Sequence, residues 1–299
     1  MKLPLALTLA ASLALAVGEA RAQASATLRF HYAVGNAARY TTRTTQTMPG
    51  ALGTTVTTAT HDVETLRVRP DGSADQRLRI VSMEMAGPNI PAAVRERVIG
   101  AMRGLAVEYT VDARGRVTAR RAVGEVPDDV RPVLDGVLDS LDQLGAALPE
   151  GPVARGATWH ERRDLRLAPG ATNLDMNVDT AYTLRELRGA GPAQVAVLGV
   201  AMTITTPAGA AVRGVRMSGS GTATGESVLE LGRGRVGSAR SSGTMRVQVS
   251  AGGRNLDLDT RFEHQMTPSA PPSAAPNAPA RPARPARPAA PARPPGAPR

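Results

Sequence analysis

The tetrapeptide Arg-Gly-Arg-Val occurs twice in this chain, at residues 114–117 and at 233–236, with an offset of 119 residues between the copies. The same offset relates three further pairs: Tyr40 with Trp159, Gly72 with Gly191, and Met83 with Met202. Self-similarity at one fixed offset is typical of a duplicated structural unit. We therefore predict that residues 28–121 and 147–240 are two copies of one unit.

Period-two patterning dominates the body of the chain, as half-buried β-strands require. Apolar residues alternate from Leu28 to Val34, and the threonine-rich stretches 41–47 and 54–60 have the β-branched side chains that suit a pleated surface. Alternation recurs in three further segments, at 174–178, 247–249 and 256–258. Residues 107–117 predict a β-hairpin that turns at Gly115.

A shift in the apolar phase occurs in both proposed units. In the first unit, Leu78 and Ile80 are followed by Val81, Met83 and Met85, one residue out of phase. In the second, the same reading places the shift between Val197 and Leu198. A one-residue shift is the sign of a β-bulge, so we expect a bulge at each place.

Two segments have helical periodicity instead. Residues 128–148 place apolar side chains at helical spacing, with Pro127 before the first turn and Gly145 and Pro149 at the end. A shorter helix is predicted from Pro91 to Arg103. The expected fold is mainly β, with antiparallel sheets from two tandem repeat units in a sandwich or curved half-barrel and one amphipathic helix between them.

The ends of the chain differ from the body. Residues 1–22 have the charged start, apolar stretch and small-residue site of a signal peptide, with cleavage after Ala22 or Ala24. Residues 267–299 repeat Pro-Ala-Arg and lack the large apolar residues that a core needs, which predicts a disordered basic tail. The expected body comprises a first β unit at 23–126, a helix at 127–148 and a second β unit at 149–266. No later segment is continuously apolar, so no transmembrane span is expected after signal removal.

Charge and cysteine content limit the possible functions. The net charge is +10, of which five positive charges lie in the tail and one near the signal, leaving about +4 for the body. The tail predicts weak attachment to anionic envelope polymers or lipid headgroups, or a plain spacer. The chain contains no cysteine, which excludes disulfides and a lipid-modified N-terminal cysteine. Its few aromatic residues count against nucleic-acid and carbohydrate platforms.

The apparent catalytic motifs all have structural interpretations. Gly232-x-Gly234-x-x-Gly237 matches a dinucleotide-binding pattern, but no helix-forming segment follows, so we interpret it as a turn. His160-Glu161 lacks the second histidine of a zinc-protease helix, and Ser220 lacks the setting of a nucleophile. Asp257 and Asp259 are expected on a solvated strand face. We assign no catalytic, cofactor-binding or metal-binding residue and predict no enzyme, although a metal or catalytic site assembled only in space stays open.

The order of several short motifs adds a resemblance. These motifs are Val34-Gly35 with Tyr40, Arg67-Val68-Arg69-Pro70-Asp71-Gly72, Leu148-Pro149-Glu150, and Gly156-Ala157-Thr158-Trp159. In this order the chain resembles a family of exported bacterial proteins that is known only as a domain of unknown function. The resemblance implies export and a β-rich, internally duplicated body, and it carries no catalytic residues. Members are often lipoproteins, from which this chain departs by lacking the cysteine.

Two functions fit these observations. The first is a non-enzymatic β-scaffold of the bacterial envelope, in the periplasm or at the cell surface. The second is a periplasmic carrier of a lipid or other apolar ligand in a cavity lidded by helix 128–148, since flexible methionines suit irregular apolar ligands. The expected ligand contacts are Tyr40, Trp159, Met83, Met202, Leu134, Leu138 and Leu141. No nucleic-acid partner is expected.

Overall fold

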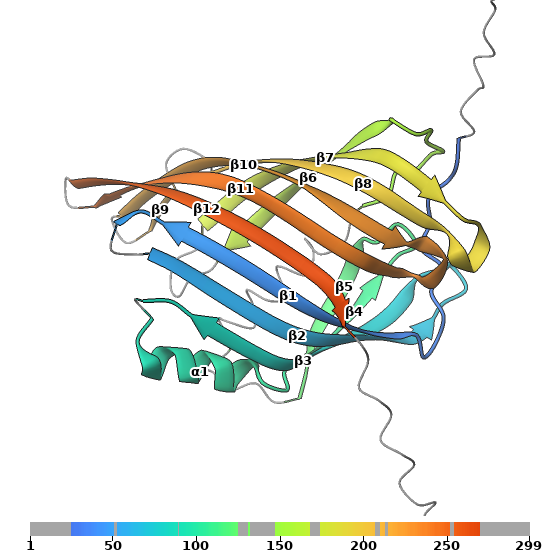
Figure 1. The fold of residues 1–299 in the computed structure, drawn as a ribbon, viewed down its shortest axis with the longest axis horizontal. Coiled ribbons are helices and arrows are strands. Elements are labelled where there is room, and N and C mark those ends of the chain that lie inside the picture. The colour runs from blue at the N-terminus through green and yellow to red at the C-terminus, as the bar shows by residue number, and fades with distance from the viewer. Residues whose placement is uncertain are drawn as a thin grey trace, which may run out of the picture. The chain divides into compact units, whose positions relative to one another are not determined.

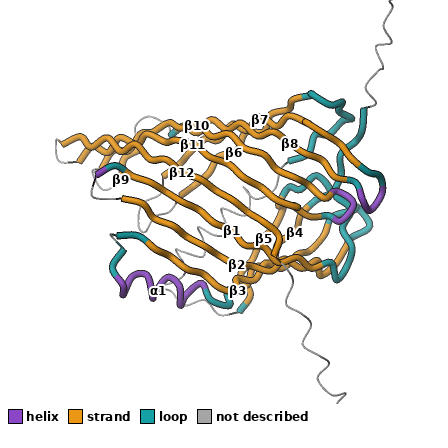
Figure 2. Tube along the Cα trace, in the orientation of Figure 1, coloured by secondary structure: helices purple, strands orange, loops and turns teal. Residues whose placement is uncertain are grey.

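The structure is a computed structural model that describes residues 25–50, 53–88, 90–124, 131, 147–167, 174–206, 210–212, 215–251 and 254–269. Its strands are β1 (Ala37–Met48), β2 (Gly53–Val68), β3 (Ala74–Ala86), β4 (Ala106–Val111), β5 (Val117–Val123), β6 (Thr158–Leu167), β7 (Leu174–Arg188), β8 (Val195–Thr205), β9 (Ala210–Val212), β10 (Val215–Glu230), β11 (Arg235–Ala251) and β12 (Arg254–Ser269). The described residues also include helix α1 (Ala92–Met102) and the short 3₁₀ turns η2 (Gly191–Ala193) and η3 (Leu231–Arg233). The predicted mainly β, antiparallel architecture is confirmed (Figures 1 and 2).

All of these strands belong to one sheet, in the order β5-β4-β3-β2-β1-β12-β11-β10-β8-β7-β6, with β9 paired to β10. Most strands pair with their neighbours along the chain. The exceptions are that β1 pairs with β12, that β8 pairs with β10 rather than with β9, and that β5 and β6 lie at opposite edges of the sheet. The pairing of β1 with β12 joins the strands of the first predicted unit to those of the second. The body is therefore continuous at this junction, through the register Thr44↔His264 and its neighbours.

Several local predictions are confirmed. The threonine-rich stretches lie in β1 and β2, and β4 and β5 form the predicted hairpin, with Gly115 at a φ of 84°. Helix α1 forms where the shorter helix was predicted and packs its Met102 against β3. The predicted helix 128–148 lies outside the described residues except Arg131, which is helical, and Ala147 and Leu148, which are buried and irregular.

Two predicted features differ from the structure. Residues Leu28 to Val34 form no strand. Leu28 and Phe30 are buried, as the alternation implies, and Val34 is exposed. The backbone amides of Phe30 and His31 bond to residues in two turns rather than to a neighbouring strand. The predicted start of the tail at Thr267 is also wrong, because β12 continues to Ser269, which lies opposite Arg39 of β1. For residues 28–34, the period-two pattern correctly indicates an extended backbone, but an extended segment can form its backbone hydrogen bonds outside a sheet.

The bulge predictions are half right. In β3, Ser82 lies opposite Thr60 and Ile80 opposite His61, so Val81 is the extra residue, as predicted. In the second unit β8 pairs with β10 without a shift, and the extra residue is Arg185 of β7. Ala196 and Leu198 therefore share the buried face, where Val195 and Val197 were expected.

The Arg185 bulge has its counterpart in the first unit. The registers shift between Thr65 and Arg67 in β2 and between Leu184 and Glu186 in β7, which are again 119 residues apart. This agreement supports the duplication, whose arrangement as two tandem units stays a prediction.

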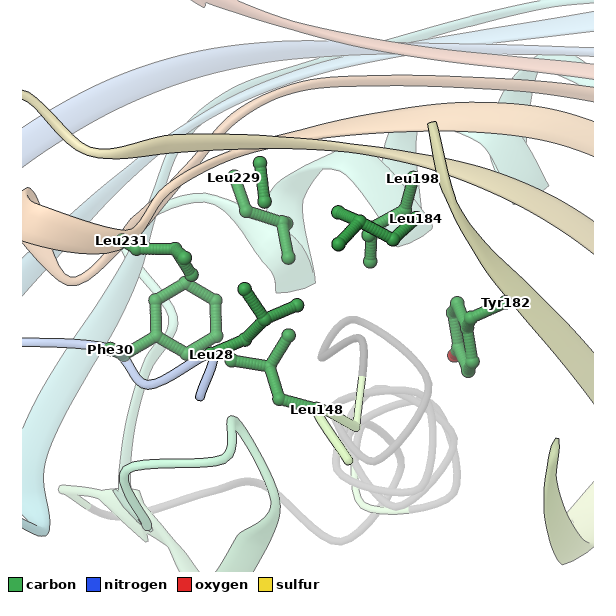
Figure 3. Close-up of a cluster of buried hydrophobic side chains, with 9 residues drawn as sticks. Leu28, Phe30, Leu148, Tyr182, Leu184, Leu198, Leu229 and Leu231 are labelled. Atoms are coloured by element: carbon green, nitrogen blue, oxygen red, sulfur yellow. The ribbon is translucent and has the colours of Figure 1, made fainter. Parts of the chain in front are cut away.

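The largest buried cluster, which we call the leucine core, joins β7, β8, β10 and η3 to the segment before β1. Figure 3 shows Leu28, Phe30 and Leu148 together beneath Leu229 and Leu231. The other members are Tyr182, Leu184, Ala196 and Leu198. A second cluster unites Leu78, Ile80, Met102 and Val107. Among the described residues, no helix has the length and hydropathy needed to cross a bilayer.

Candidate functional site: a cavity between the two repeated turns

The repeated tetrapeptides form two tight turns with the same local structure. In the β4–β5 turn, the Gly115 amide donates to the Asp112 carbonyl oxygen at 2.9 Å; in the β10–β11 turn, the Gly234 amide donates to the Leu231 carbonyl oxygen at 3.1 Å. Both glycines have positive φ, 84° and 60°, which is why glycine recurs at this place. The sequence repeat is therefore also a repeat of turn geometry.

The segment before β1 lies between these turns and bonds to both. The Phe30 amide donates to the Ala113 carbonyl oxygen at 2.8 Å, and the next amide, of His31, donates to Leu231 at 2.8 Å. The Tyr32 hydroxyl then donates to the Asp112 carbonyl oxygen at 3.0 Å. Consecutive residues of one extended segment thus hold together two turns that are far apart in the sequence.

A second tyrosine contact joins β1 to β11, on the other side of β12. The Tyr40 hydroxyl donates to the carbonyl oxygen of Val236, at 2.7 Å. Tyr40 lies near the start of β1, and Val236 lies near the start of β11. This bond links two strands of the sheet that are separated by β12.

These contacts border a partly open cavity of about 100 Å³, which we call the tyrosine cavity. Four of the seven aromatic residues of the chain line it: Phe30, Tyr32, Tyr40 and Tyr109. Aliphatic side chains complete most of the wall, namely Val63, Leu78, Val111, Val117, Val236 and Met266. Gly115 and Gly234 of the two repeated turns also line it, so both copies of the repeat contribute to one site.

The aromatic rings are arranged as two stacked pairs. Phe30 and Tyr32 stack with ring centroids 5.9 Å apart, and Tyr40 stacks with His61 of β2 at 5.5 Å. Offset stacking of this kind is favourable beyond the area that it buries. Both stacked pairs line the cavity.

The phenol and imidazole groups of the walls are neutral near pH 7. Burial raises the pKa of Tyr32 and of Tyr109 well above the ordinary range and raises that of Tyr40 to about 12. Burial likewise lowers the pKa of His61 to about 4, so its imidazole is neutral. Arg235 also lines the cavity, but its guanidinium is paired with Glu230 at 2.8 Å.

Few polar groups face the cavity. The Gln76 side-chain amide donates to the Thr65 hydroxyl at 3.1 Å, and Asn36 is bonded to the carbonyl oxygen of Arg233. The Tyr109 hydroxyl has no hydrogen-bond partner within the described part of the chain, in contrast to those of Tyr32 and Tyr40. An apolar enclosure with a few convergent polar groups is the usual form of a small-molecule site.

The predicted ligand contacts lie in different places. Tyr40 lines the tyrosine cavity. Trp159 lies beside the leucine core, where its indole N–H donates to the Ala147 carbonyl oxygen at 2.7 Å and its ring stacks on Tyr182. Met83 and Met202 pack against two other clusters. Leu134, Leu138 and Leu141 lie outside the described residues.

Tyr40 and Trp159 are also not equivalent positions in their strands. Tyr40 lies opposite His61, four residues before the Thr65 bulge, whereas Trp159 lies opposite Tyr182, two residues before the Leu184 bulge. The offset of 119 therefore pairs them in sequence but places them two residues apart in register.

Sequence analysis missed Tyr32, Tyr109 and His61 as site residues. Each lies on an extended segment whose alternation indicates only that the side chain points inward. The available signal was the position of Tyr109 beside the first repeated turn, together with the concentration of aromatic residues at 30–40. Both become informative only when the two turns are known to meet.

The other motifs have the structural roles that the sequence suggested. The Gly232–Gly237 pattern spans η3, the turn and the start of β11, while His160 and Glu161 lie on β6 and Ser220 on β10. Asp259 is exposed and paired with Arg246 at 2.7 Å. Within the described ranges, no three His, Asp or Glu side chains come together as a metal site.

No family model matches the chain, and no curated protein matches it. Among solved structures, the chain is similar to lipovitellin, seen in a structure of its lipid–protein interactions, with a TM-score of 0.45 and 10% identity over 80% of this chain. The chain spans only 25% of the length of that protein. Two mutants of the Rh. blastica porin give a TM-score of 0.23 at 9% identity, covering 77% of this chain and 99% of the porin. Likenesses at this level carry no functional argument.

Proposed function

We propose that this protein is an exported, non-enzymatic binding protein that holds a small apolar molecule in the tyrosine cavity. The observation that carries the proposal is the partly open, mostly apolar cavity of about 100 Å³ that both repeated turns line. A closed apolar cavity of about 150 Å³ can hold benzene, so a space of this order accommodates no more than about one ring. The ligand is therefore a small apolar molecule, or one end of a longer one.

The hydrogen bonds around the cavity support this function over that of a plain scaffold. Tyr32 and Tyr40 use their hydroxyls to hold the walls, and these bonds keep the space open between β1, β4 and β11. A closed core would gain by filling the same volume with side chains, because interiors pack at the density of organic crystals. A maintained void lined by rings favours a bound ligand.

Export follows from the signal pattern of residues 1–22, and the envelope is the compartment that fits it. The arginine-rich tail adds weak attachment to anionic polymers or lipid headgroups there. We place the chain in the family of exported proteins that its motifs resemble. Each of these assignments is independent of the cavity.

The test is native mass spectrometry of residues 23–299 purified from their own envelope without strong detergent. We expect a mass excess from one small molecule. Replacement of Ala38, which lines the cavity, by leucine should fill the space and remove the extra mass. Ala201→Leu, at an exposed position on β8, is the matched control and should keep it.

A bare polypeptide mass, still bare after incubation with an extract of envelope lipids and small apolar molecules, would contradict ligand binding. The protein would then be the scaffold, acting through its surface or its tail. Thermal unfolding of both variants shows whether Ala38→Leu keeps the fold.

A further inference from the structure

A buried apolar cluster lies on β7 and β8, and none of its members lines the tyrosine cavity. Its members are Met176 and Val178 of β7 with Met202 and Ile204 of β8, and we call it the methionine cluster. Val178 lies directly opposite Ile204, so these side chains stand next to one another on a single face of the sheet. Met176 and Val178 are nevertheless only 6% and 8% exposed.

This degree of burial requires a second layer over the methionine cluster. Neighbours on one face of a sheet shield each other's flanks, whereas the tips of their side chains become buried only beneath another element. Among the described residues, the hydrophobic side chains that pack against Met176 and Val178 are those of the adjacent strand β8. The cover therefore comes from outside the described residues.

Residues 125–146 end beside the methionine cluster. Ala147, which follows them directly, is 2% exposed and accepts a hydrogen bond from the Trp159 indole at 2.7 Å. Trp159 stacks on Tyr182 of β7, and Tyr182 lies on the same face of that strand as Val178. The chain therefore reaches β6 over the apolar face of the sheet.

The length of this connection suits the distance to the cluster. Residues 125–146 link β5 to β6, which lie at opposite edges of the sheet. Tyr182 and Val178 are four residues apart in β7, which is about 13 Å along an extended strand. A helix that leads back from Ala147 covers the same distance in about nine residues. This geometry places Leu138 near Val178.

The pattern of residues 125–146 matches an apolar face on one side and water on the other. Their apolar side chains recur at helical spacing, and three aspartates fall on the opposite side of the same helix. The apolar residues are Val130, Val133, Leu134, Val137, Leu138, Leu141 and Leu144, and the aspartates are Asp135, Asp139 and Asp142. Arg131, which the structure does describe, is helical and exposed.

We propose that residues 125–146 pack as a fixed second layer on the methionine cluster, with Leu134, Leu138 and Leu141 against it. These leucines then contact the protein's own apolar face and no ligand. The inference goes beyond the proposed function and does not depend on it, because the methionine cluster and the tyrosine cavity share no residue. An apolar ligand or a second copy of the chain on the same face are the competing covers.

Thiol reactivity on the full mature chain tests the cover. The chain contains no cysteine, so one introduced thiol reports its own exposure. Val178→Cys places it in the methionine cluster, and Asn177→Cys places it at the next, exposed position of the same strand. We expect the Val178→Cys thiol to react with Ellman's reagent at least about tenfold more slowly, because buried thiols are inert.

A second substitution in each chain identifies what covers the thiol. Adding Leu138→Gln to Val178→Cys should raise the labelling rate toward that of Asn177→Cys, since a polar side chain weakens packing on an apolar face. Adding Asp139→Gln, on the opposite side of the same expected helix, is the matched control and should leave the rate low. Thermal unfolding of each variant shows whether it keeps the fold.

Disulfide scanning gives a readout that needs no destabilising change. Val178→Cys is combined with one further cysteine at a time, and a disulfide closes only where the two Cα atoms come within about 7 Å. We expect at least one leucine position to form an intramolecular disulfide and the aspartate positions to form none. The scanned positions are Leu134, Leu138 and Leu141, with Asp135, Asp139 and Asp142 as controls.

The remaining outcomes overturn the inference. Equal labelling of Val178→Cys and Asn177→Cys would show that nothing covers the methionine cluster. Slow labelling that rises when the protein is diluted would assign the cover to a second copy, and a rise after extraction of apolar molecules would assign it to a ligand. Disulfides formed equally well from the aspartate positions would contradict the proposed face. None of these results changes the test of the tyrosine cavity by native mass spectrometry.

Discussion

Gly234 shows how closely single residues determine the meeting of the two turns. Its φ is 60°, and an added β-carbon would lie 2.6 Å from Cδ1 of Tyr32 and 2.8 Å from the His31 carbonyl oxygen. Both the left-handed backbone and the close approach of the segment before β1 therefore require glycine. Gly35 has a similar φ of 78° but no neighbour within 4 Å of the same position.

We expect Gly234→Ala to lower the free energy of unfolding by about 3 kcal/mol, from backbone strain and the displaced segment together. Gly35→Ala, which suffers strain alone, should cost about 1 kcal/mol. Urea denaturation of both variants measures the difference. Equal losses of unfolding free energy in the two variants would show that the segment before β1 does not pack closely against Gly234.

His61 gives the fold a dependence on pH. Burial lowers its pKa from 6.5 to about 4; the adjacent Asp62 opposes this shift and His264 adds to it. As the pH falls below 6.5, the unfolded chain takes up a proton that the folded protein does not accept until about pH 4. The free energy of unfolding is therefore lost progressively across that window, by at most about 3 kcal/mol.

Denaturant midpoints at pH 7, 6, 5 and 4.5 test this expectation. His61→Gln should flatten the dependence, leaving the smaller part that the lowered pKa of His264 contributes. His31→Gln changes an exposed histidine and serves as the control. A slope that is the same in His61→Gln and in the unmodified protein would contradict the burial of a neutral imidazole.

At the scale of elements, β10 and β11 are closely packed because β10 carries small residues. The inward face of β10 carries small residues, with Ala223 between Gly221 and Gly225. A β-carbon on Gly221 would lie 2.6 Å from the Thr244 carbonyl oxygen of β11. Glycine in a strand interior often marks such a close backbone approach.

Replacing glycine by alanine should therefore change the stability of the protein in opposite directions in β10 and in α1. Gly221→Ala should destabilise the protein by roughly 2 kcal/mol because β10 and β11 must separate. Gly100→Ala in helix α1, where nothing lies within 4 Å, should stabilise it by about 0.5–1 kcal/mol. Thermal unfolding of the pair is the measurement, and a gain in both variants would show that β10 tolerates a side chain.

Across the whole molecule, the segment before β1 joins the leucine core to the tyrosine cavity. Leu28 is fully buried in the core, Phe30 belongs to the core and lines the cavity, and Tyr32 lines the cavity. Leu28→Ala should therefore cost about 3 kcal/mol, the usual loss for a buried leucine. Leu256→Ala, at a side chain that is 55% exposed, should cost well under 1 kcal/mol. Chemical denaturation of both variants measures the difference. Similar losses of unfolding free energy would contradict the burial of Leu28 in the leucine core.

The tail stays a prediction from composition. Because β12 ends at Ser269, a chain that stops there keeps every described strand. We expect deletion of residues 270–299 to leave the unfolding midpoint unchanged and to abolish cosedimentation with anionic vesicles at low salt. In the full chain, this cosedimentation should weaken as salt rises, since screening reduces attraction between exposed charges. Retained binding after the deletion would assign attachment to the body.

The sequence alone determined the extended character of most segments, helix α1 and the two repeated turns. Each of these depends on residues within a few positions of one another, through the side-chain period and the φ preference of glycine. Only the tertiary structure decided that residues 28–34 cross between two turns, that the second bulge lies at Arg185, and that Tyr40 joins Tyr32, Tyr109 and His61 around one cavity. Those outcomes depend on which distant strands pair and in what register. Strand register is selected by packing over the whole sheet, and a local pattern repeated in many strands does not specify it.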